Sequence, residues 1–118
     1  IVVDEAATVE DAERAARKLA GSLLVKSSFY GSDPYWGRVL SELGVAEVAM
    51  DTDTVTIAYD DVVVSKGLAP TDASADAIAV AASEEFTLTC RLGAGRHRYH
   101  VHTNDLSHAY IDENMTTS

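Results

Sequence analysis

Two kinds of hydrophobic periodicity alternate along this chain, and together they limit the folds that its 118 residues can adopt. Apolar residues recur every three or four positions in 12–20 and 36–43, which is the spacing of one helix face. In 86–92 and 99–101 they alternate with polar residues, which is the spacing of one strand face. Each element must bury its apolar face against another. We therefore predict one α+β (mixed α/β) domain, with a mostly antiparallel sheet packed by two to three helices.

The first predicted helix has a signal at each end. Thr8 is followed three positions later by Asp11, as in a capping box, and Gly21 stands where the helix should end. Its apolar face consists of small residues suited to close packing on a sheet: Ala12, Ala15, Ala16, Leu19 and Ala20.

A second helix is predicted to begin in the turn 31–34, because Asp33 can cap it and Pro34 suits a first helical position. Trp36, Val39, Leu40 and Leu43 form its apolar stripe, and Gly44 is expected to end it. Short strands are predicted at 1–3, 45–50, 54–59 and 62–65, with a further candidate at 27–30, and Asp60-Asp61 is a plausible hairpin turn. Ala69-Pro70 is expected to break the chain before an alanine-rich helix that runs from Thr71 to about Ser83.

The last two strands are predicted to form a hairpin. Pairing Cys90 with Tyr99 and Leu88 with Val101 places apolar residues together on one face, with the loop at 93–96. The opposite face then carries polar and basic residues: Thr87, Thr89, Arg91, Arg98, His100 and His102.

Charge and cysteine content exclude several classes of protein. Nine basic against nineteen acidic residues give a net charge of −10, which disfavours binding to nucleic acid. No apolar stretch approaches the ~20 residues of a membrane span. The lone Cys90 excludes an internal disulfide and makes a cytoplasmic setting the default. The chain opens on the strand-like triplet Ile1-Val2-Val3 without a Met, so we expect further chain upstream.

The densest motif occupies residues 24–38. It contains Leu24-Val25-Lys26 and, after a gap, Gly31-Ser32-Asp33-Pro34-Tyr35-Trp36-Gly37-Arg38. This stretch resembles the L-V-K-(T)-A-x-x-G-x-D-P-N-W-G-R signature of the ornithine acetyltransferase family. Residues 103–114 are similar to the family's closing D-L-[ST]-x-x-Y-[VI]-x-x-N segment, and the resemblance runs in order along nearly the whole chain.

The resemblance implies an acyltransferase of arginine biosynthesis that moves acetyl from N-acetylornithine to glutamate. In the family a precursor cleaves itself before a threonine, which becomes the nucleophile at the start of the β chain, and the assembly is α2β2. Residues 1–118 then correspond to the C-terminal domain of the β chain and lack the catalytic N-terminal part. Their partners are the α chain, the rest of the β chain and small amino-acid substrates.

The resemblance also implies individual site residues. Asn114 matches a substrate-binding asparagine, and Ser118, or Thr117, would supply a substrate-binding hydroxyl near the end of the chain. The signature residues that would hold the local structure are Lys26, Gly31, Asp33, Pro34, Trp36, Gly37 and Arg38. No catalytic residue and no cofactor is assigned within this chain.

Two alternatives remain open at this point. Tyr35, where the family has Asn, and the basic segment 91–100 favour a diverged binding or structural domain, or a related acyltransferase with another substrate. A metal site at His100 and His102 is disfavoured because Arg91 and Arg98 on the same face would repel a cation. That basic stripe is instead expected to meet an acidic surface of the rest of the enzyme or of a neighbouring subunit.

Overall fold

A computed structural model describes residues 1–22, 36–73, 76–77, 80, 86–103 and 111–112. The described helices are α1 (Val9–Gly21) and α3 (Trp36–Val45). The strands are β1 (Val2–Ala6), β2 (Thr56–Tyr59), β3 (Val62–Lys66), β4 (Ala69–Pro70), β5 (Leu88–Arg91), β6 (His97–His100), β7 (His102–Thr103) and β8 (Ile111–Asp112).

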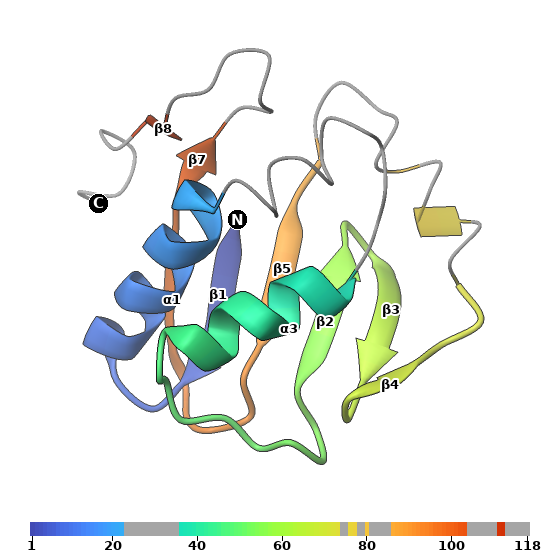
Figure 1. The fold of residues 1–118 in the computed structure, drawn as a ribbon, viewed down its shortest axis with the longest axis horizontal. Coiled ribbons are helices and arrows are strands. Elements are labelled where there is room, and N and C mark those ends of the chain that lie inside the picture. The colour runs from blue at the N-terminus through green and yellow to red at the C-terminus, as the bar shows by residue number, and fades with distance from the viewer. Residues whose placement is uncertain (23–35, 74–75, 78–79, 81–85, 104–110, 113–118) are drawn as a thin grey trace.

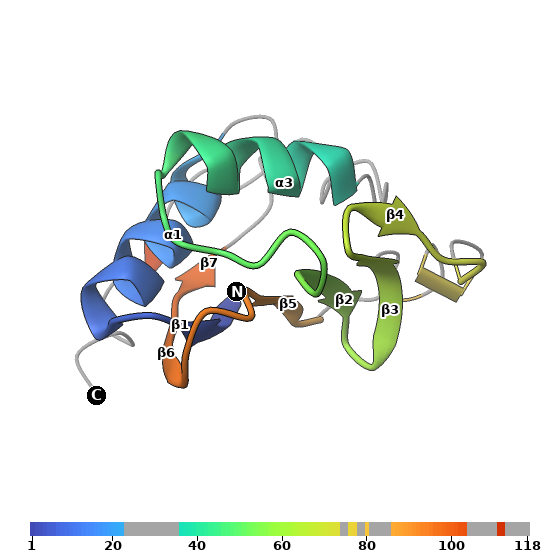
Figure 2. The same cartoon turned by 90° about the horizontal axis from the view of Figure 1, so that it is seen from below.

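The first six strands form one mixed sheet in the order β4-β3-β2-β5-β1-β6, and β7 pairs with β8 separately. In the larger sheet only β1 and β5 run parallel, and every other neighbouring pair is antiparallel. Helices α1 and α3 lie side by side over the same face of this sheet (Figures 1 and 2). The predicted fold class, a mostly antiparallel α+β sheet packed by helices, is confirmed.

Helix α1 forms as its sequence predicts. The Thr8 hydroxyl accepts a hydrogen bond from the Asp11 backbone N–H at 3.0 Å, which satisfies one of the free N–H groups of the first turn. The whole apolar face is buried with no exposed surface: Ala12, Ala15, Ala16, Leu19 and Ala20. These small residues let the helix backbone approach the sheet closely.

The strand predicted at 45–50 is wrong. Val45 is still the last residue of α3, and Ala46 donates its N–H to the Glu42 carbonyl, which extends the helical hydrogen bonding by one more residue. Glu47 then turns the chain with φ at 57°. The apolar residues of this stretch cover the sheet from a loop, where Ala46 and Val48 are buried in the core.

The predicted hairpin of the last two strands is also wrong, because β1 lies between them. Val3 pairs with Cys90 on one side and with Tyr99 on the other. Cross-strand neighbours share a face, so Cys90 and Tyr99 do lie on the same face as predicted, but one strand apart. The alternation of apolar residues predicted the face correctly and the neighbour incorrectly.

Residues that are paired across neighbouring strands show where the core lies. Ile57, Cys90 and Val3 are paired neighbours with no exposed surface, and they face α1 and α3 together with Leu43 of α3. Tyr59, also fully buried, lies 5.7 Å from the ring of Phe86. The core therefore lies between one face of the sheet and the two helices.

The β2–β3 hairpin forms at the predicted turn. Tyr59 pairs with Val62, and Asp60 adopts φ 52°, which aspartate tolerates better than most residues. Asp60 also accepts from and donates to the backbone of Thr87, both at 2.7 Å, which ties the turn to the chain leading into β5.

Ala69 and Pro70, which are expected to separate the strands from the next helix, form the two-residue strand β4 at an edge of the sheet, where a proline is tolerated. Of the helix predicted from 71 to 83, residues 76, 77 and 80 are helical, whereas residues 71–73 are described and are not, so the predicted start at Thr71 is wrong. The strand candidate at 27–30 lies outside the described residues.

A tight loop joins β5 to β6 and packs on the irregular part of β1. The register of β1 against β6 shifts between Val3 and Ala6, and Glu5 takes φ 54° there. The Glu5 carbonyl accepts hydrogen bonds from the N–H groups of Ala94 and Gly95 at 2.9 and 3.0 Å. A Cβ on Gly95 would lie 2.5 Å from the Ala6 carbonyl oxygen, so the close approach requires glycine.

We predict that Gly95→Ala lowers the free energy of unfolding by about 1–3 kcal/mol, because a methyl group must push the loop away from β1. Gly44→Ala in α3 is the matched control, since a Cβ there meets nothing within 4 Å. It should be neutral or stabilising by up to about 1 kcal/mol. Urea unfolding of both variants measures the difference, and equal effects would contradict the loop packing described.

Candidate functional site

The second half of the signature motif opens α3. Trp36 is half-buried and packs against the core, Gly37 follows it, and Arg38 is exposed. Val39 and Leu43, one and two turns along, are fully buried, so the helix is held on the sheet by the predicted stripe. The structure therefore places these three signature residues together in the first turn of α3.

The other predicted site residues cannot be placed in this way. Those that lie outside the described residues are Lys26, Gly31, Asp33, Pro34, Asn114, Thr117 and Ser118. Their roles stay predictions from the resemblance.

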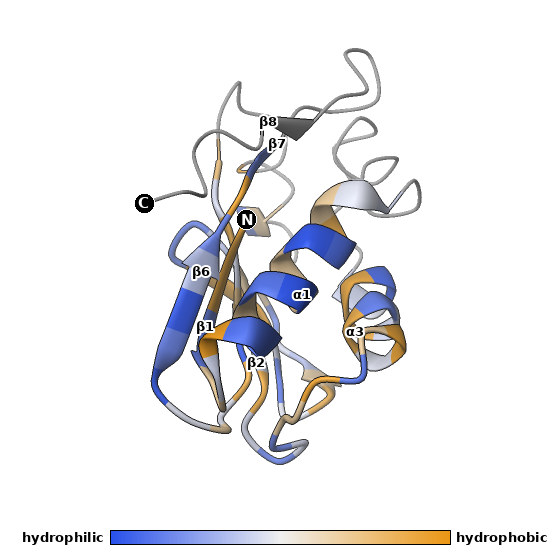
Figure 3. Cartoon of the chain, turned by 90° about the vertical axis from the view of Figure 1, so that its left-hand side faces the viewer, coloured by the Kyte–Doolittle hydropathy of each residue, from blue (hydrophilic) through white to orange (hydrophobic). Residues whose placement is uncertain are grey.

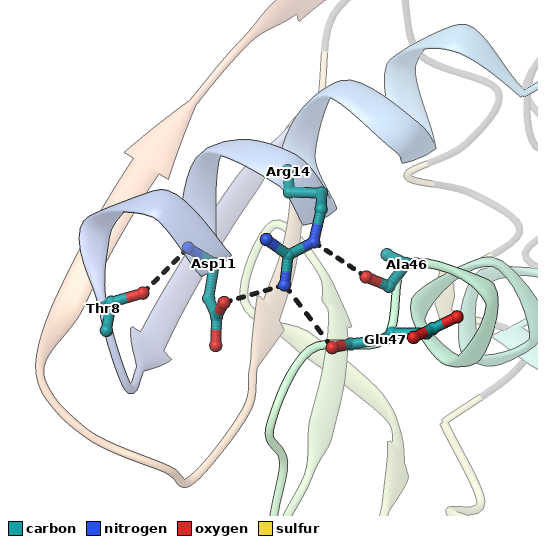
Figure 4. A network of polar contacts seen from close by, with 5 residues as sticks. All are labelled: Thr8, Asp11, Arg14, Ala46 and Glu47. Carbon is teal, nitrogen blue, oxygen red and sulfur yellow. Dashed lines mark hydrogen bonds and ion pairs between the residues drawn. The ribbon is translucent and has the colours of Figure 1, made fainter.

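The opposite end of α3 is fastened to α1 by Arg14, which sequence reasoning missed. Its Nε donates to the Ala46 carbonyl at 2.9 Å, and its guanidinium also donates to the Glu47 carbonyl at 3.4 Å and to the Asp11 carboxylate at 2.8 Å (Figure 4). Ala46 directly follows α3, so its carbonyl lies at the negative end of the helix dipole, and Glu47 turns the chain away from there with φ at 57°. A cation from α1 thus holds the chain where α3 ends.

Arg17, one turn further along α1, joins the helix to the edge strand β6. Its guanidinium lies 5.8 Å from the centre of the Tyr99 ring and donates to the Tyr99 hydroxyl at 3.2 Å. It also pairs with Glu13 at 3.0 Å. Only the pairs at i+3 and i+4 within α1 could be read from the sequence, whereas the contacts with Ala46 and Tyr99 join residues far apart in the chain.

A shallow depression of about 680 Å³ lies beside this network. Its lining residues are Arg14, Arg17, Lys18, Val45, Ala46 and Glu47. Each cation already has a carboxylate partner, since Lys18 lies 3.7 Å from Glu42 and the two arginines pair within α1. The depression therefore offers neither a nucleophile nor a free charge for a substrate, and the contacts around it serve packing.

Arg91, Arg98 and His100 lie on the sheet face that points away from the helices. Thr89, Val2 and His100 are paired neighbours across three strands, so they share that face as predicted. The rings of His100 and His102 meet edge to face at 5.6 Å. Within the described residues no three metal-ligating side chains gather, so this pair has no third ligand there. Figure 3 shows most of β6 as hydrophilic.

Cys90 is placed in the middle of the core rather than at a site. Its burial raises the pKa of the thiol from an ordinary value of 9.0 to about 12. The thiol is therefore neutral at physiological pH, and a neutral, buried thiol is a poor nucleophile. Because the pKa is raised on folding, its contribution to stability is complete below pH 9 and is lost as the pH rises towards 12.

Comparison with known proteins identifies the relatives of this chain. The model of the ArgJ family matches residues 1–117. The arginine biosynthesis bifunctional protein ArgJ of Mycobacterium tuberculosis is 37% identical over the whole chain, and that of Neisseria gonorrhoeae is 40% identical over 95% of it. The crystal structure of the argJ protein from Bacillus halodurans aligns with a TM-score of 0.75 and 28% identity over 82% of the chain.

The architecture is that of an α+β domain with both described helices on one face of a mixed sheet. Nearly full coverage by the family model then identifies the domain: this chain belongs to the ArgJ family. It spans 29% of the length of the mycobacterial relative and 46% of the aligned Bacillus chain. Among the described residues no helix is long and apolar enough to cross a membrane.

We predict that Cys90 of the folded protein resists alkylation by iodoacetamide at pH 8 and reacts fully in denaturant, because the thiol is buried and protonated. Thr87→Cys supplies a matched control, since residue 87 is exposed just before the same strand. Mass spectrometry of the labelled peptides gives both rates. Equal labelling of Cys90 and the control cysteine in the folded protein would show that the thiol is not in the core.

Proposed function

We propose that the protein carrying this chain transfers the acetyl group of N-acetylornithine to glutamate in arginine biosynthesis. The observation that carries the proposal is the family match over residues 1–117, supported by relatives whose names assign them to arginine biosynthesis. This region would complete the substrate site and support assembly of the enzyme, in the cytoplasm and as an α2β2 tetramer.

The chemistry proposed is covalent acetyl transfer by a nucleophile outside this chain. A threonine released by self-cleavage of the precursor would use its own amine as the base for its hydroxyl and would accept the acetyl group. The one cysteine of this chain does not compete for that role, because its thiol is buried and neutral. In this proposal the acetyl group is transferred by the remainder of the enzyme, and this region contributes to substrate binding.

Asn114 and Ser118 are the residues proposed to bind substrate. An asparagine amide can both donate to a carboxylate and accept from an ammonium, and a serine hydroxyl can do the same, so the pair suits an amino-acid substrate. The signature residues at the start of α3 would support the site through the packing of Trp36 rather than through chemistry.

A second candidate is a related protein that binds amino acids or other subunits without this reaction. The basic segment 91–100, which departs from the family pattern, favours it. Acetyl transfer by the full-length protein separates the two. Formation of N-acetylglutamate and ornithine in equal amounts supports the enzyme, and no turnover of N-acetylornithine with glutamate supports the second candidate.

We expect Asn114→Ala in the full-length enzyme to raise the KM for both amino acids about tenfold, since a hydrogen bond to a charged group contributes roughly 1.5–3 kcal/mol. Steady-state kinetics with N-acetylornithine and with glutamate measure it. Asn104→Ala is the control, with the same chemical change at a residue that carries no assigned role. An unchanged KM for both substrates in Asn114→Ala would show that the site assignment is wrong.

A further inference from the structure

The sheet has a face on which no described helix packs. Val3, Ile57 and Cys90 point towards α1 and α3. Successive side chains of a strand alternate between its faces, so the residues directly before and after each of these three point the other way. We call this side the open face (Figure 2). It is formed by Val2, Asp4, Thr56, Ala58, Lys66, Thr89, Arg91, Arg98 and His100, with His102 next to it.

The centre of the open face is made of small and apolar residues. One row of paired neighbours runs from Ala58 through Thr89 and Val2 to His100. Ala58 is buried, Thr89 and Val2 are half-buried, and all three side chains are short. A centre of short side chains with charged residues at its margin is the composition of a protein interface.

The charged side chains at this margin are positive except for one carboxylate, although the whole chain is strongly negative. The sequence has no Asp or Glu between residues 86 and 104, yet the chain carries a net charge of −10. Asp4, the one carboxylate on the open face, accepts a hydrogen bond from the adjacent Glu5 N–H. Arg91 and Arg98 therefore stand in a local excess of positive charge.

The arginines of this face differ from the cations on the helix side in their pairing. Arg14, Arg17 and Lys18 of α1 each have a carboxylate within 4 Å. Arg91 and Arg98 form no ion pair with any residue in the described part of the chain. Two unpaired guanidinium groups flanking a row of short side chains are suited to bidentate contacts with carboxylates.

We propose that the open face docks on a carboxylate-bearing surface of the remaining part of the same enzyme, with Arg91 and Arg98 pairing to its acidic side chains. The inference rests on the proposed function, in which this region supports assembly. Relatives of this chain are more than twice its length, so most of their chain lies outside the matched region and is available as a second layer. A sheet of this kind buries both faces when a further layer is present.

Two other occupants fit the face less well. A second copy in a two-fold contact would bring the same face against itself and would place arginine near arginine. Nucleic acid would have to approach an acidic molecule against its net charge. An acidic surface elsewhere in the enzyme satisfies the sign of the charges.

Zero-length cross-linking of the full-length protein tests the proposal. Arg98→Lys, and separately Arg91→Lys, keep the positive charge and introduce an amine that a carbodiimide joins to a neighbouring carboxylate with loss of water. Lys18 of α1, which lies 3.7 Å from Glu42 on the helix side of the sheet, serves as the internal control in the same sample. A mixture of ¹⁵N-labelled and unlabelled protein identifies bonds that join two copies, and mass spectrometry locates each bond.

The expected result is a bond from the introduced lysine to an Asp or Glu outside residues 1–118, with no such bond from Lys18. Bonds only to Asp4 or Glu5, bonds that join residues 1–118 of two copies, or no bond at all would overturn the proposal. The readout does not depend on turnover. If the full-length protein does not transfer acetyl but the expected cross-link forms, only the proposed function is rejected. If it transfers acetyl but the cross-link does not form, only the docking is rejected.

Discussion

The arrangement of this domain depends on one strand, β1, which pairs on both sides. It runs parallel to β5 and antiparallel to β6, so residues 2–6 lie between two strands that follow each other closely in the chain. The Ile1 nitrogen donates to the Val101 carbonyl and the Val101 N–H donates to the Ile1 carbonyl, both at 2.9 Å, so the pairing continues beyond β6. Strand β1 thus joins the beginning of the chain to residues nearly a hundred positions later, and the core row through Val3 exists only because of it.

The position of β1 determines where the helices and the polar contacts lie. Helix α1 follows β1 after a short turn and packs back over β1 and β6, which brings Arg17 onto the Tyr99 ring. Because α1 lies there, Arg14 can reach the carbonyls that follow α3 and hold the second helix beside the first. Both helices consequently cover one face, and the arginines of β5 and β6 are left on the other.

Local features were predictable from sequence, and long-range neighbours were not. The hydroxyl cap at Thr8 and the small-residue face of α1 depend on residues within a few positions, and both are confirmed. Alternation showed that Cys90 and Tyr99 share a face, but it holds no information on whether a third strand separates them. In the candidate site, the first turn of α3 was predicted from a motif, whereas the contacts of Arg14 and Arg17 require the tertiary structure.

The insertion of β1 can be measured directly with paired cysteines in the full-length protein. Val2 and His100 are antiparallel neighbours, whereas Thr89 and His100 have β1 between them and lie about 9–10 Å apart, twice the strand spacing. A disulfide needs Cα atoms within about 7 Å. The account predicts that Val2→Cys with His100→Cys forms a disulfide under mild oxidation and that Thr89→Cys with His100→Cys does not. The reverse result would mean that β5 and β6 form a direct hairpin, and it would contradict the fold described.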